Sequence, residues 1–190
     1  NCELDQYSFT NKKNTLATIY IVRDPRNLIS SISNHYSKTL EDSKEFLFTP
    51  KFIGGYKKNG DLIKESLKTL LGTWSEHYKF WKNNNEDFLL IKYEDLIKDT
   101  RLELKKIISF IKKYTDVQTN EAKNENIIKT TSFKYLQNFE EKGYFNENAF
   151  KTINKKNKFF NLGPKNDWKN LLNKKIINEI ENKFSYEMKE

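Results

Sequence analysis

Two arginines in a charged turn near the start of the chain have the chemistry of an anion site. Lys and Arg together number 34, but only Arg23, Arg26 and Arg101 are arginines. Arginine carries a planar fork that binds phosphate or carboxylate through two parallel hydrogen bonds, whereas lysine is a mobile point charge. Two readings stay open: an anion site, or a turn in which Arg23 pairs with an acid such as Asp24.

The residues around this turn predict the elements that position it. Thr18–Val22 is an apolar, β-branched run that predicts a strand, and apolar residues from Leu28 to Tyr36 recur at the spacing of a helix from Asn27 to about Ser37. Ligands bind at the carboxyl ends of strands in open α/β sheets, where helix N–H groups can face an anion. The turn therefore suits an anion.

A second strand, Phe88–Tyr93, ends in the adjacent carboxylates Glu94 and Asp95. General bases are found at such positions, but the two acids are equally placed to cap the next helix or to pair with Arg23, and we favour that structural role. Thr100 and Glu103 predict a capping box for the helix that follows. Strand, helix, strand, helix predicts an α/β fold with a parallel sheet covered by helices.

The rest of the chain is predicted mostly helical, in a single domain over residues 1–190. Residues 1–14 carry no periodicity and are expected to form a loop or an incoming segment, whereas the long segment Lys142–Asp167 is expected to be a functional loop. Turns are predicted at Gly54-Gly55 and Asn59-Gly60. Helices are predicted over Thr39–Leu47, Asp61–Trp81, Asn120–Lys129, Phe133–Glu141 and Lys174–Met188.

Composition restricts the partners and the chemistry. The net charge of +8 admits an anionic ligand or a nucleic acid, but the lysines are spread along the chain among asparagines, which favours solvated faces over a nucleic-acid surface. A lone Cys2 excludes internal disulfides and indicates a reducing compartment, so we expect a cytoplasmic protein. His35 and His77 lie in helical patterns and are predicted to be structural. No metal-ligand spacing and no membrane-spanning run occurs in the sequence.

Four motifs, taken in order from Leu16 onward, closely resemble the cytosolic-type sulfotransferases. The resemblance implies a P-loop-like parallel sheet flanked by helices. It also implies transfer of a sulfonate group from 3′-phosphoadenosine 5′-phosphosulfate (PAPS) to a hydroxyl or amine of a small-molecule or saccharide acceptor, without a metal. The motifs are Ile19–Asn27 with Ser31, then Tyr93–Asp95, then Thr131–Phe133, and last Phe159–Asn170.

Individual residues acquire expected roles from this resemblance. Arg23 and Ser31 match the residues that hold the 3′-phosphate of the donor, which leaves Arg26 as a surface charge. Tyr93, Thr131 and Phe133 match residues around the adenosine.

The last motif departs from the family. Asn161, Leu162 and Gly163 stand where the family has Arg-Lys-Gly. Two cationic contacts are therefore missing, each worth about 1.5–3 kcal/mol, unless Lys158 or Lys165 replaces them.

The resemblance also implies that the catalytic groups lie before Asn1. In the family, the first strand, a Pro-Lys-Ser-Gly-Thr loop that carries the catalytic lysine, and the histidine base all precede the segment seen here. We therefore expect a carboxyl-terminal portion of about two-thirds of the protein, incomplete at the N-terminus and inactive alone. The alternatives are a non-catalytic sulfotransferase-like module that binds an anionic polysaccharide or a protein partner, and, third, a lysine-driven nucleic-acid binder.

Overall fold

Two parallel strands and the helices that follow them organise the molecule. The computed structural model describes residues 2–4, 7–10, 13–53, 57–58, 61–62, 69–84, 87–145 and 158–189. The turns predicted at Gly54-Gly55 and Asn59-Gly60 lie outside the described residues. The stretch 146–157 of the predicted functional loop also lies outside them. Within the described part, no helix is both long and apolar enough to cross a bilayer.

Strand β3 (Thr18–Val22) pairs in parallel with β8 (Phe88–Lys92), from Thr18 opposite Phe88 to Val22 opposite Lys92. Because the two strands are in register, their carboxyl ends meet at one edge. Helix α1 (Pro25–Tyr36) leaves from β3, whereas α4 (Tyr93–Lys98) and α5 (Thr100–Ile111) follow β8. Helix α3 (Trp74–Asn84) packs on β3 and α5 packs on β8. The predicted α/β class with a parallel strand pair is confirmed.

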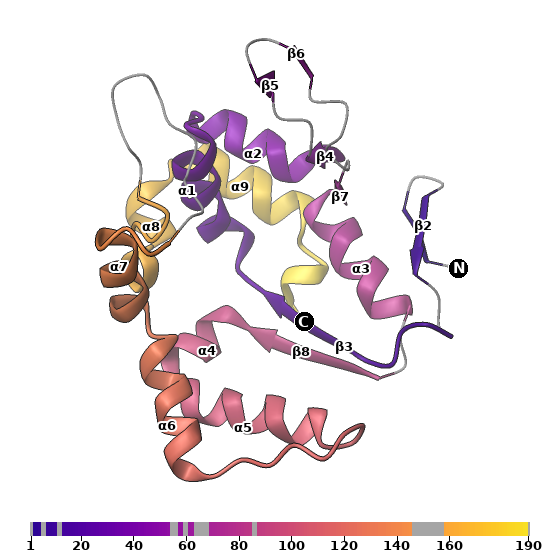
Figure 1. The fold of residues 1–190 in the computed structure, drawn as a ribbon. Helices are drawn as coiled ribbons and strands as arrows, with labels where there is room; N and C mark the ends of the chain where they lie inside the picture. Colours follow the sequence, from indigo (N-terminus) through magenta and orange to yellow (C-terminus); the bar gives the residue numbers. More distant parts are fainter. Residues whose placement is uncertain are drawn as a thin grey trace.

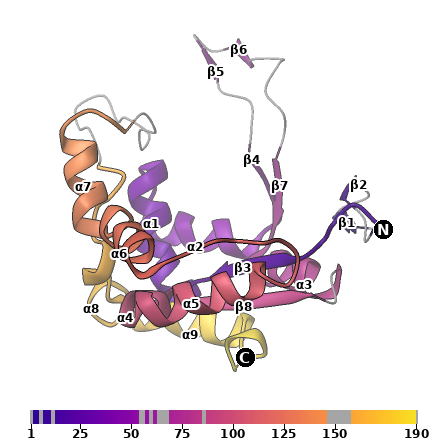
Figure 2. The ribbon, with the colours of Figure 1, turned by 60° about the horizontal axis from the view of Figure 1, so that its bottom comes forward.

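The other elements surround this strand pair. Figure 1 shows α3 beside β3, with α4 and α5 beside β8, whereas α2 packs on α1 and α9, and α6 packs on α5. The antiparallel β1–β2 pair lies on the α3 side of the molecule in Figures 1 and 2, with β1 in contact with α3. The remaining elements are α2 (Leu40–Phe48), α6 (Glu121–Thr130), α7 (Phe133–Glu141), η1 (Gly163–Lys165), α8 (Trp168–Leu171), α9 (Lys174–Lys183), η2 (Glu187–Lys189), and the strands β1 (Cys2–Leu4), β2 (Tyr7–Thr10), β4 (Lys51–Ile53), β5 (Lys57–Lys58), β6 (Asp61–Leu62) and β7 (Thr69–Gly72).

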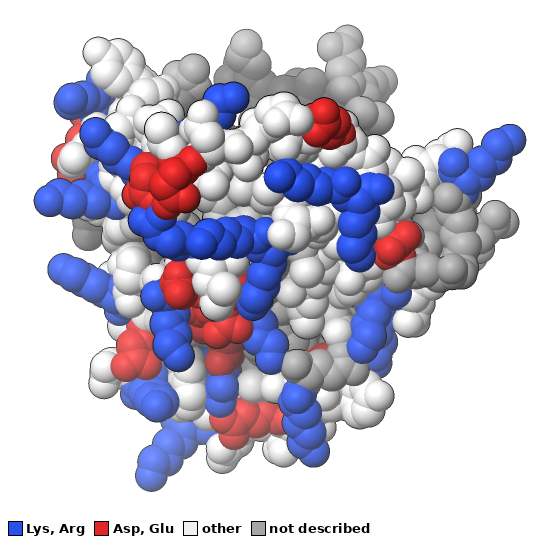
Figure 3. Space-filling view, turned by 90° about the horizontal axis from the view of Figure 1, so that it is seen from below, with Lys and Arg blue, Asp and Glu red and all other residues white. Residues whose placement is uncertain are grey.

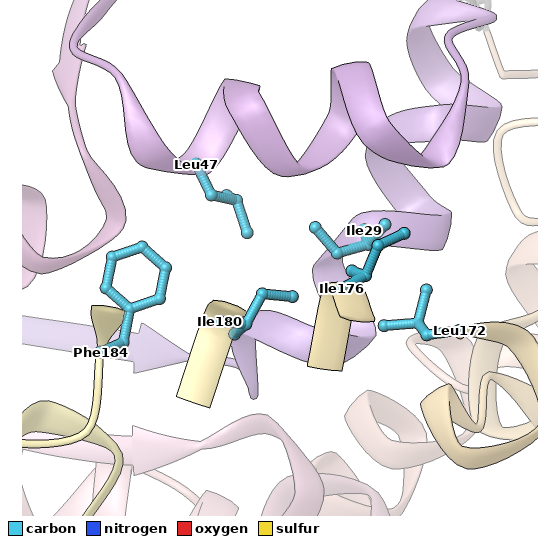
Figure 4. Close-up of a cluster of buried hydrophobic side chains, with 6 residues drawn as sticks. All are labelled: Ile29, Leu47, Leu172, Ile176, Ile180 and Phe184. Atoms are coloured by element: carbon cyan, nitrogen blue, oxygen red, sulfur yellow. The ribbon is translucent and has the colours of Figure 1, made fainter. Parts of the chain in front are cut away.

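The main apolar cluster joins α1 and α2 to the carboxyl-terminal helices. Figure 4 shows Ile29 of α1 and Leu47 of α2 facing the side chains of α9. The last helix was predicted to bury one face, and Ile176, Ile180 and Phe184 are indeed at most 1% exposed. Burial of each such side chain stabilises the fold by about 1.5–3 kcal/mol. Since Ile29 is held by this cluster, α1 is fixed in place behind the turn at Arg23.

The predicted helix Asp61–Trp81 is wrong at residues 61–62 and 69–72, and its residues 63–68 lie outside the described part of the chain. Asp61–Leu62 and Thr69–Gly72 are strands, and the latter pairs with Lys51–Ile53. The helix begins only at Trp74, after Gly72 with a positive φ of 67°. Thr73 and Glu76 form the start signal that was missed: the Thr73 hydroxyl accepts from the N–H of Glu76 at 3.2 Å, and the Glu76 carboxylate accepts from the N–H of Thr73 at 2.7 Å.

Two other local predictions are corrected. Residues 1–14 were expected to form a loop, yet Glu3 pairs with Ser8 and Leu4 with Tyr7 in an antiparallel pair, because strands this short carry no readable periodicity. The capping box predicted at Thr100 is also wrong. Asp99 caps α5 by accepting from the N–H of Leu102 at 3.0 Å, whereas the Thr100 hydroxyl donates to the carbonyl of Leu96 at 2.8 Å.

Other predicted helices agree with the structure. Thr39 caps α2 by accepting from the N–H of Asp42 at 3.1 Å, as predicted from their spacing. Helices α6 and α7 occupy the predicted positions and are capped by Asn120 and Ser132. Charged side chains of both signs are interspersed over the face drawn in Figure 3.

Candidate anion-binding site

The turn after β3 is held by an ion-pair cluster around Arg26. Asp24 caps α1 by accepting from the N–H of Arg26 at 2.9 Å, and the Arg26 guanidinium donates back to both Asp24 carboxylate oxygens, at 2.6–3.2 Å. The same guanidinium pairs with Glu181 of α9 at 2.6 Å and lies 4.0 Å from the centre of the Trp168 ring. The hydrogen bond to Asp24 raises the pKa of Arg26 above its ordinary value.

These contacts overturn the prediction that Arg26 is a surface charge. Its side chain is only 19% exposed, and it joins the turn to α9 and to the segment that carries Trp168. The acid Asp24, considered as a partner of Arg23, pairs with Arg26 instead. Arg26 is therefore the structural arginine of the turn.

Arg23 has the contacts of an arginine that is held ready for a ligand. Its Nη1 donates to the Ser31 hydroxyl at 3.1 Å, and its guanidinium lies 4.5 Å from the centre of the Tyr93 ring. Its Nε is buried with no hydrogen-bond partner, and it has no carboxylate partner among the described residues. A buried donor without an acceptor costs about 1–3 kcal/mol, which an anionic ligand would offset.

The acids that follow β8 do not neutralise Arg23. Glu94 accepts from the backbone N–H of Asp24 at 3.2 Å and so ties α4 to the turn. Glu94 and Asp95 occupy the first turn of α4, where carboxylates are favoured by the helix dipole. The structural role favoured from the sequence is thus partly confirmed, without the pairing to Arg23.

Ser31 is held between the turn and the segment 158–167, which we call the late loop. Its Oγ accepts from Arg23 and also lies 3.4 Å from Nδ2 of Asn166. Asn166 also donates to the carbonyl of Asn27 at 2.8 Å and accepts from the Ser30 hydroxyl at 2.6 Å. Asn27 in turn accepts from the N–H of Trp168 at 3.1 Å. The late loop is therefore attached to α1 directly beside Ser31.

Phe133 and Gly163 form the far end of this site. Gly163 has a φ of 52°, and a Cβ placed on it would lie 2.5 Å from Cδ2 and Cζ of Phe133. Only glycine lets the loop backbone approach the ring so closely. Asn166 donates from its N–H to the carbonyl of Gly163 at 3.1 Å, so this contact is linked to Ser31 within four residues of chain.

The late loop is also bound to α7. Glu140 accepts from the N–H groups of Phe159 and Phe160 at 2.6 and 2.9 Å, and Gln137 donates to the carbonyl of Phe160 at 3.1 Å. Lys158, considered as a replacement for the missing cations, pairs with Glu141 at 2.6 Å. Of the two lysines considered, Lys165 is therefore the one that no described carboxylate holds.

The structure thus brings five of the eight predicted site residues into one chain of contacts. Tyr93, Arg23 and Ser31 touch in sequence, Asn166 links Ser31 to the loop, and Gly163 meets Phe133. Thr131 ends α6 and donates to the carbonyl of Ile127 at 2.7 Å. Asn161 is exposed and Leu162 is half-buried, and no contact joins either to Arg23 or Ser31 within the described residues.

Sequence reasoning missed Asn166 and Asn27 as members of the site. Both lie inside the quoted motifs, but their importance comes from contacts between residues 139 apart in the chain. The only sign of their role in the sequence was the residue type, because an asparagine side chain can both donate and accept hydrogen bonds.

Two hollows flank Arg23 and Val22. One, of about 210 Å³, is also lined by Arg26, Lys92 and Met188. The other, of about 230 Å³, is lined by aromatic residues that include Tyr20, Phe46 and Trp74, together with His77. In the described part of the chain, no group of three or more His, Cys, Asp or Glu side chains is placed to hold a metal ion.

A neutral hydrogen bond borders the second hollow. The Tyr20 hydroxyl lies 2.8 Å from Nδ1 of His77. Burial lowers the pKa of His77 and raises that of Tyr20, so both side chains are held uncharged near neutral pH. His35 packs edge-on against Tyr36 and Phe159. Both histidines thus lie inside helices among aromatic rings, as predicted.

Comparison with known proteins identifies the family of the chain. Residues 4–190 match the family model of the sulfotransferase domain. The chain is 25% identical over 191 residues to an amine sulfotransferase of Oryctolagus cuniculus, covering 94% of this chain and 56% of the relative. It is 30% identical over 164 residues to sulfotransferase 2A6 of Rattus norvegicus, covering 80% and 49%, and 30% identical over 131 residues to a 3-beta-hydroxysteroid sulfotransferase of Cavia porcellus, covering 66% and 40%.

The fold is shared with a solved sulfotransferase. The structure of mouse sulfotransferase SULT7A1 complexed with PAP matches with a TM-score of 0.61 at 24% identity, covering 91% of this chain and 58% of that one. The chain spans about half the length of the curated relatives it matches. Because the family model matches nearly every residue, the chain belongs to the sulfotransferase domain family.

Proposed function

We propose that this chain forms the 3′-phosphate and adenosine half of a PAPS site in a sulfotransferase that acts on a hydroxyl or amine acceptor. The observation that carries the proposal is the set of contacts that the Arg23 guanidinium makes. Its buried Nε has no hydrogen-bond partner among the described residues, its Nη1 donates to Ser31, and its guanidinium lies over the ring of Tyr93. A phosphate is a suitable acceptor for such a fork.

The position of Arg23 fits a nucleotide phosphate. It lies at the carboxyl edge shared by β3 and β8, where ligands of open α/β sheets bind. The aromatic rings of Tyr93 and Phe133 lie at the two ends of the contact chain that includes Arg23, Ser31 and Gly163. Such rings can pack on a purine, and Thr131 lies two residues before Phe133. The neighbour of known structure was solved with PAP, which supports the same class of ligand.

The chemistry assigned to the whole enzyme is transfer of the sulfonate group from PAPS to the acceptor oxygen or nitrogen. The sulfonate–phosphate bond breaks, the acceptor loses a proton, and adenosine 3′,5′-bisphosphate leaves. In this chain, Arg23 and Ser31 bind and orient the donor, and we assign no catalytic base to residues 1–190. An oriented donor without an activated acceptor does not react efficiently, so we propose that the chain is inactive alone. Relatives named for amines and a 3-beta-hydroxysteroid support a small-molecule acceptor, and we propose a cytoplasmic location.

Calorimetric titration of the chain with adenosine 3′,5′-bisphosphate and with adenosine 5′-monophosphate tests the proposal. We expect the 3′-phosphate to increase affinity, and Arg23→Ala to remove about ten- to a hundredfold of the bisphosphate affinity because a charged hydrogen bond is lost. Arg101→Ala is the matched control, because Arg101 pairs with Glu121 and Glu125 on the surface between α5 and α6. Its affinity should equal that of the wild type.

A rival function gives a different result in the same experiment. A module that binds an anionic polysaccharide would bind heparin, retain that binding in Arg23→Ala, and show no preference for the 3′-phosphate. Asn161 and Leu162, which stand where the family has two cations, favour this rival. Equal affinity for the two nucleotides, or unchanged bisphosphate binding in Arg23→Ala, would rule out the proposed function.

A further inference from the structure

We propose that Asn166 is a positioning residue of the anion site, and that it orients the Ser31 hydroxyl toward the 3′-phosphate. This inference rests on the proposed function. Asn166 is only 9% exposed, and its amide contacts three residues of α1: Asn27, Ser30 and Ser31. It lies three residues after Gly163, in the loop where the family has Arg-Lys-Gly.

The hydrogen bonds of the amide fix its orientation. One Nδ2 hydrogen goes to the carbonyl of Asn27 at 2.8 Å and the other points to Ser31 Oγ at 3.4 Å, while Oδ1 accepts from Ser30 at 2.6 Å. A flipped amide would place an oxygen against the Asn27 carbonyl, which cannot donate. The Nδ2 group therefore faces Ser31.

This orientation decides what Ser31 can do. Its oxygen accepts from Arg23 Nη1 at 3.1 Å and from Asn166, which uses both acceptor positions of the hydroxyl. The Ser31 proton must then point away from both donors, and no acceptor for it is found among the described residues. An oxygen of a phosphate bound by Arg23 is the acceptor that this geometry favours.

The late loop can thus affect anion binding through Asn166 rather than through cations. Where the family places two cations, this chain has Asn161 and Leu162, and Lys158 is paired with Glu141. Asn166 adds no charge, but it removes the freedom of the Ser31 hydroxyl and holds the loop beside it. Fixing a donor before the ligand arrives lowers the entropy lost on binding.

Two variants separate positioning from folding. Asn166→Ala removes the donor to Ser31, and we expect about a five- to tenfold loss of affinity for adenosine 3′,5′-bisphosphate. Asn166→Asp has the same shape but presents an acceptor to Ser31, which draws the Ser31 proton away from the phosphate and adds a negative charge, so its loss should be larger. Affinity for adenosine 5′-monophosphate, which lacks the 3′-phosphate, should be unchanged in both.

A pH series adds a readout that a purely structural role would not affect. Protonation of the introduced carboxyl group at lower pH should restore part of the bisphosphate affinity of Asn166→Asp, relative to the wild type at the same pH. Asn170→Ala is the control, since Asn170 lies on α8 and its side chain bonds to Asp167 at 2.9 Å without reaching α1. Circular dichroism and thermal unfolding check that each variant is folded.

Three outcomes overturn the inference. Bisphosphate affinity equal to the wild type in both variants shows that Ser31 needs no orientation. Equal loss of both nucleotides shows that Asn166 merely maintains the loop. If the wild type shows no preference for the 3′-phosphate, the proposed function falls and this inference with it. If Asn166→Ala fails to fold, the isosteric Asn166→Asp variant still decides between the first two.

Discussion

The ring of Phe133 fills the space that any side chain at position 163 would need, since a Cβ on Gly163 would lie 2.5 Å from Cδ2 and Cζ of that ring. The first residue of α7 and the start of η1 are therefore in direct contact. This contact places the Thr131–Phe133 motif against the late loop.

Gly163→Ala is expected to destabilise the protein by about 2–4 kcal/mol, because it combines the strain of a positive φ with a clash against Phe133. Chemical denaturation measures the change. Gly143→Ala is the matched control: its φ is 77°, but nothing lies within 4 Å of the added Cβ, so only the backbone cost of about 1–2 kcal/mol applies. Equal losses of unfolding free energy for the two substitutions would show that the contact with Phe133 does not contribute to the cost at position 163.

Arg26→Lys should destabilise the fold by about 1–3 kcal/mol even though it keeps the charge. The lysine cannot reproduce the fork that reaches Asp24 and Glu181 or the stacking on Trp168. Thermal and urea unfolding test this. Arg101→Lys should leave stability close to that of the wild type, because its partners lie on the surface. A stable Arg26→Lys variant would contradict the structural role given to Arg26.

Asp99→Ala is expected to cost about 1 kcal/mol, because the N–H of Leu102 loses its cap. Thr100→Ala should cost less, since the Thr100 hydroxyl only donates to the carbonyl of Leu96 within the preceding turn. The comparison distinguishes the cap seen in the structure from the capping box expected from sequence. If Thr100→Ala proved the more destabilising, the capping-box expectation would be restored.

Acid should destabilise the protein in part through His77. Because burial lowers the pKa of His77 in the folded state, the unfolded chain binds more protons below the ordinary value of about 6.5, and stability falls as the pH drops through that value. We expect the unfolding midpoint of His77→Gln to fall less between pH 7 and pH 5 than that of the wild type. Parallel pH curves for His77→Gln and the wild type would disprove this assignment.

Local sequence signals were sufficient to predict the elements that carry Arg23 and Ser31. Arg23 and Ser31 are eight residues apart within one strand–turn–helix unit, so apolar spacing and turn chemistry were enough to predict their elements. The capping of α2 by Thr39 was predictable for the same reason, since the donor and acceptor lie within one turn.

Contacts between distant segments account for what the sequence did not reveal. The partner of Arg26 on α9 lies 155 residues away, so its pairing could not be inferred from its neighbours. The apolar spacing of Leu70 and Leu71 led to the prediction of a helix at β7. The pairing of this segment with β4 makes it a strand instead. Asn166 was missed because each of its side-chain partners belongs to α1.

Asn27 binds the late loop through its carbonyl and the first residue of α8 through its side-chain oxygen. Those two bonds join parts of the chain 139 and 141 residues apart, so the candidate anion site exists only in a chain whose late loop is packed on α1. A nucleotide that binds this site would therefore stabilise the folded chain by mass action. An increase in resistance to proteolysis when the nucleotide is added would therefore report that the late loop is packed on α1.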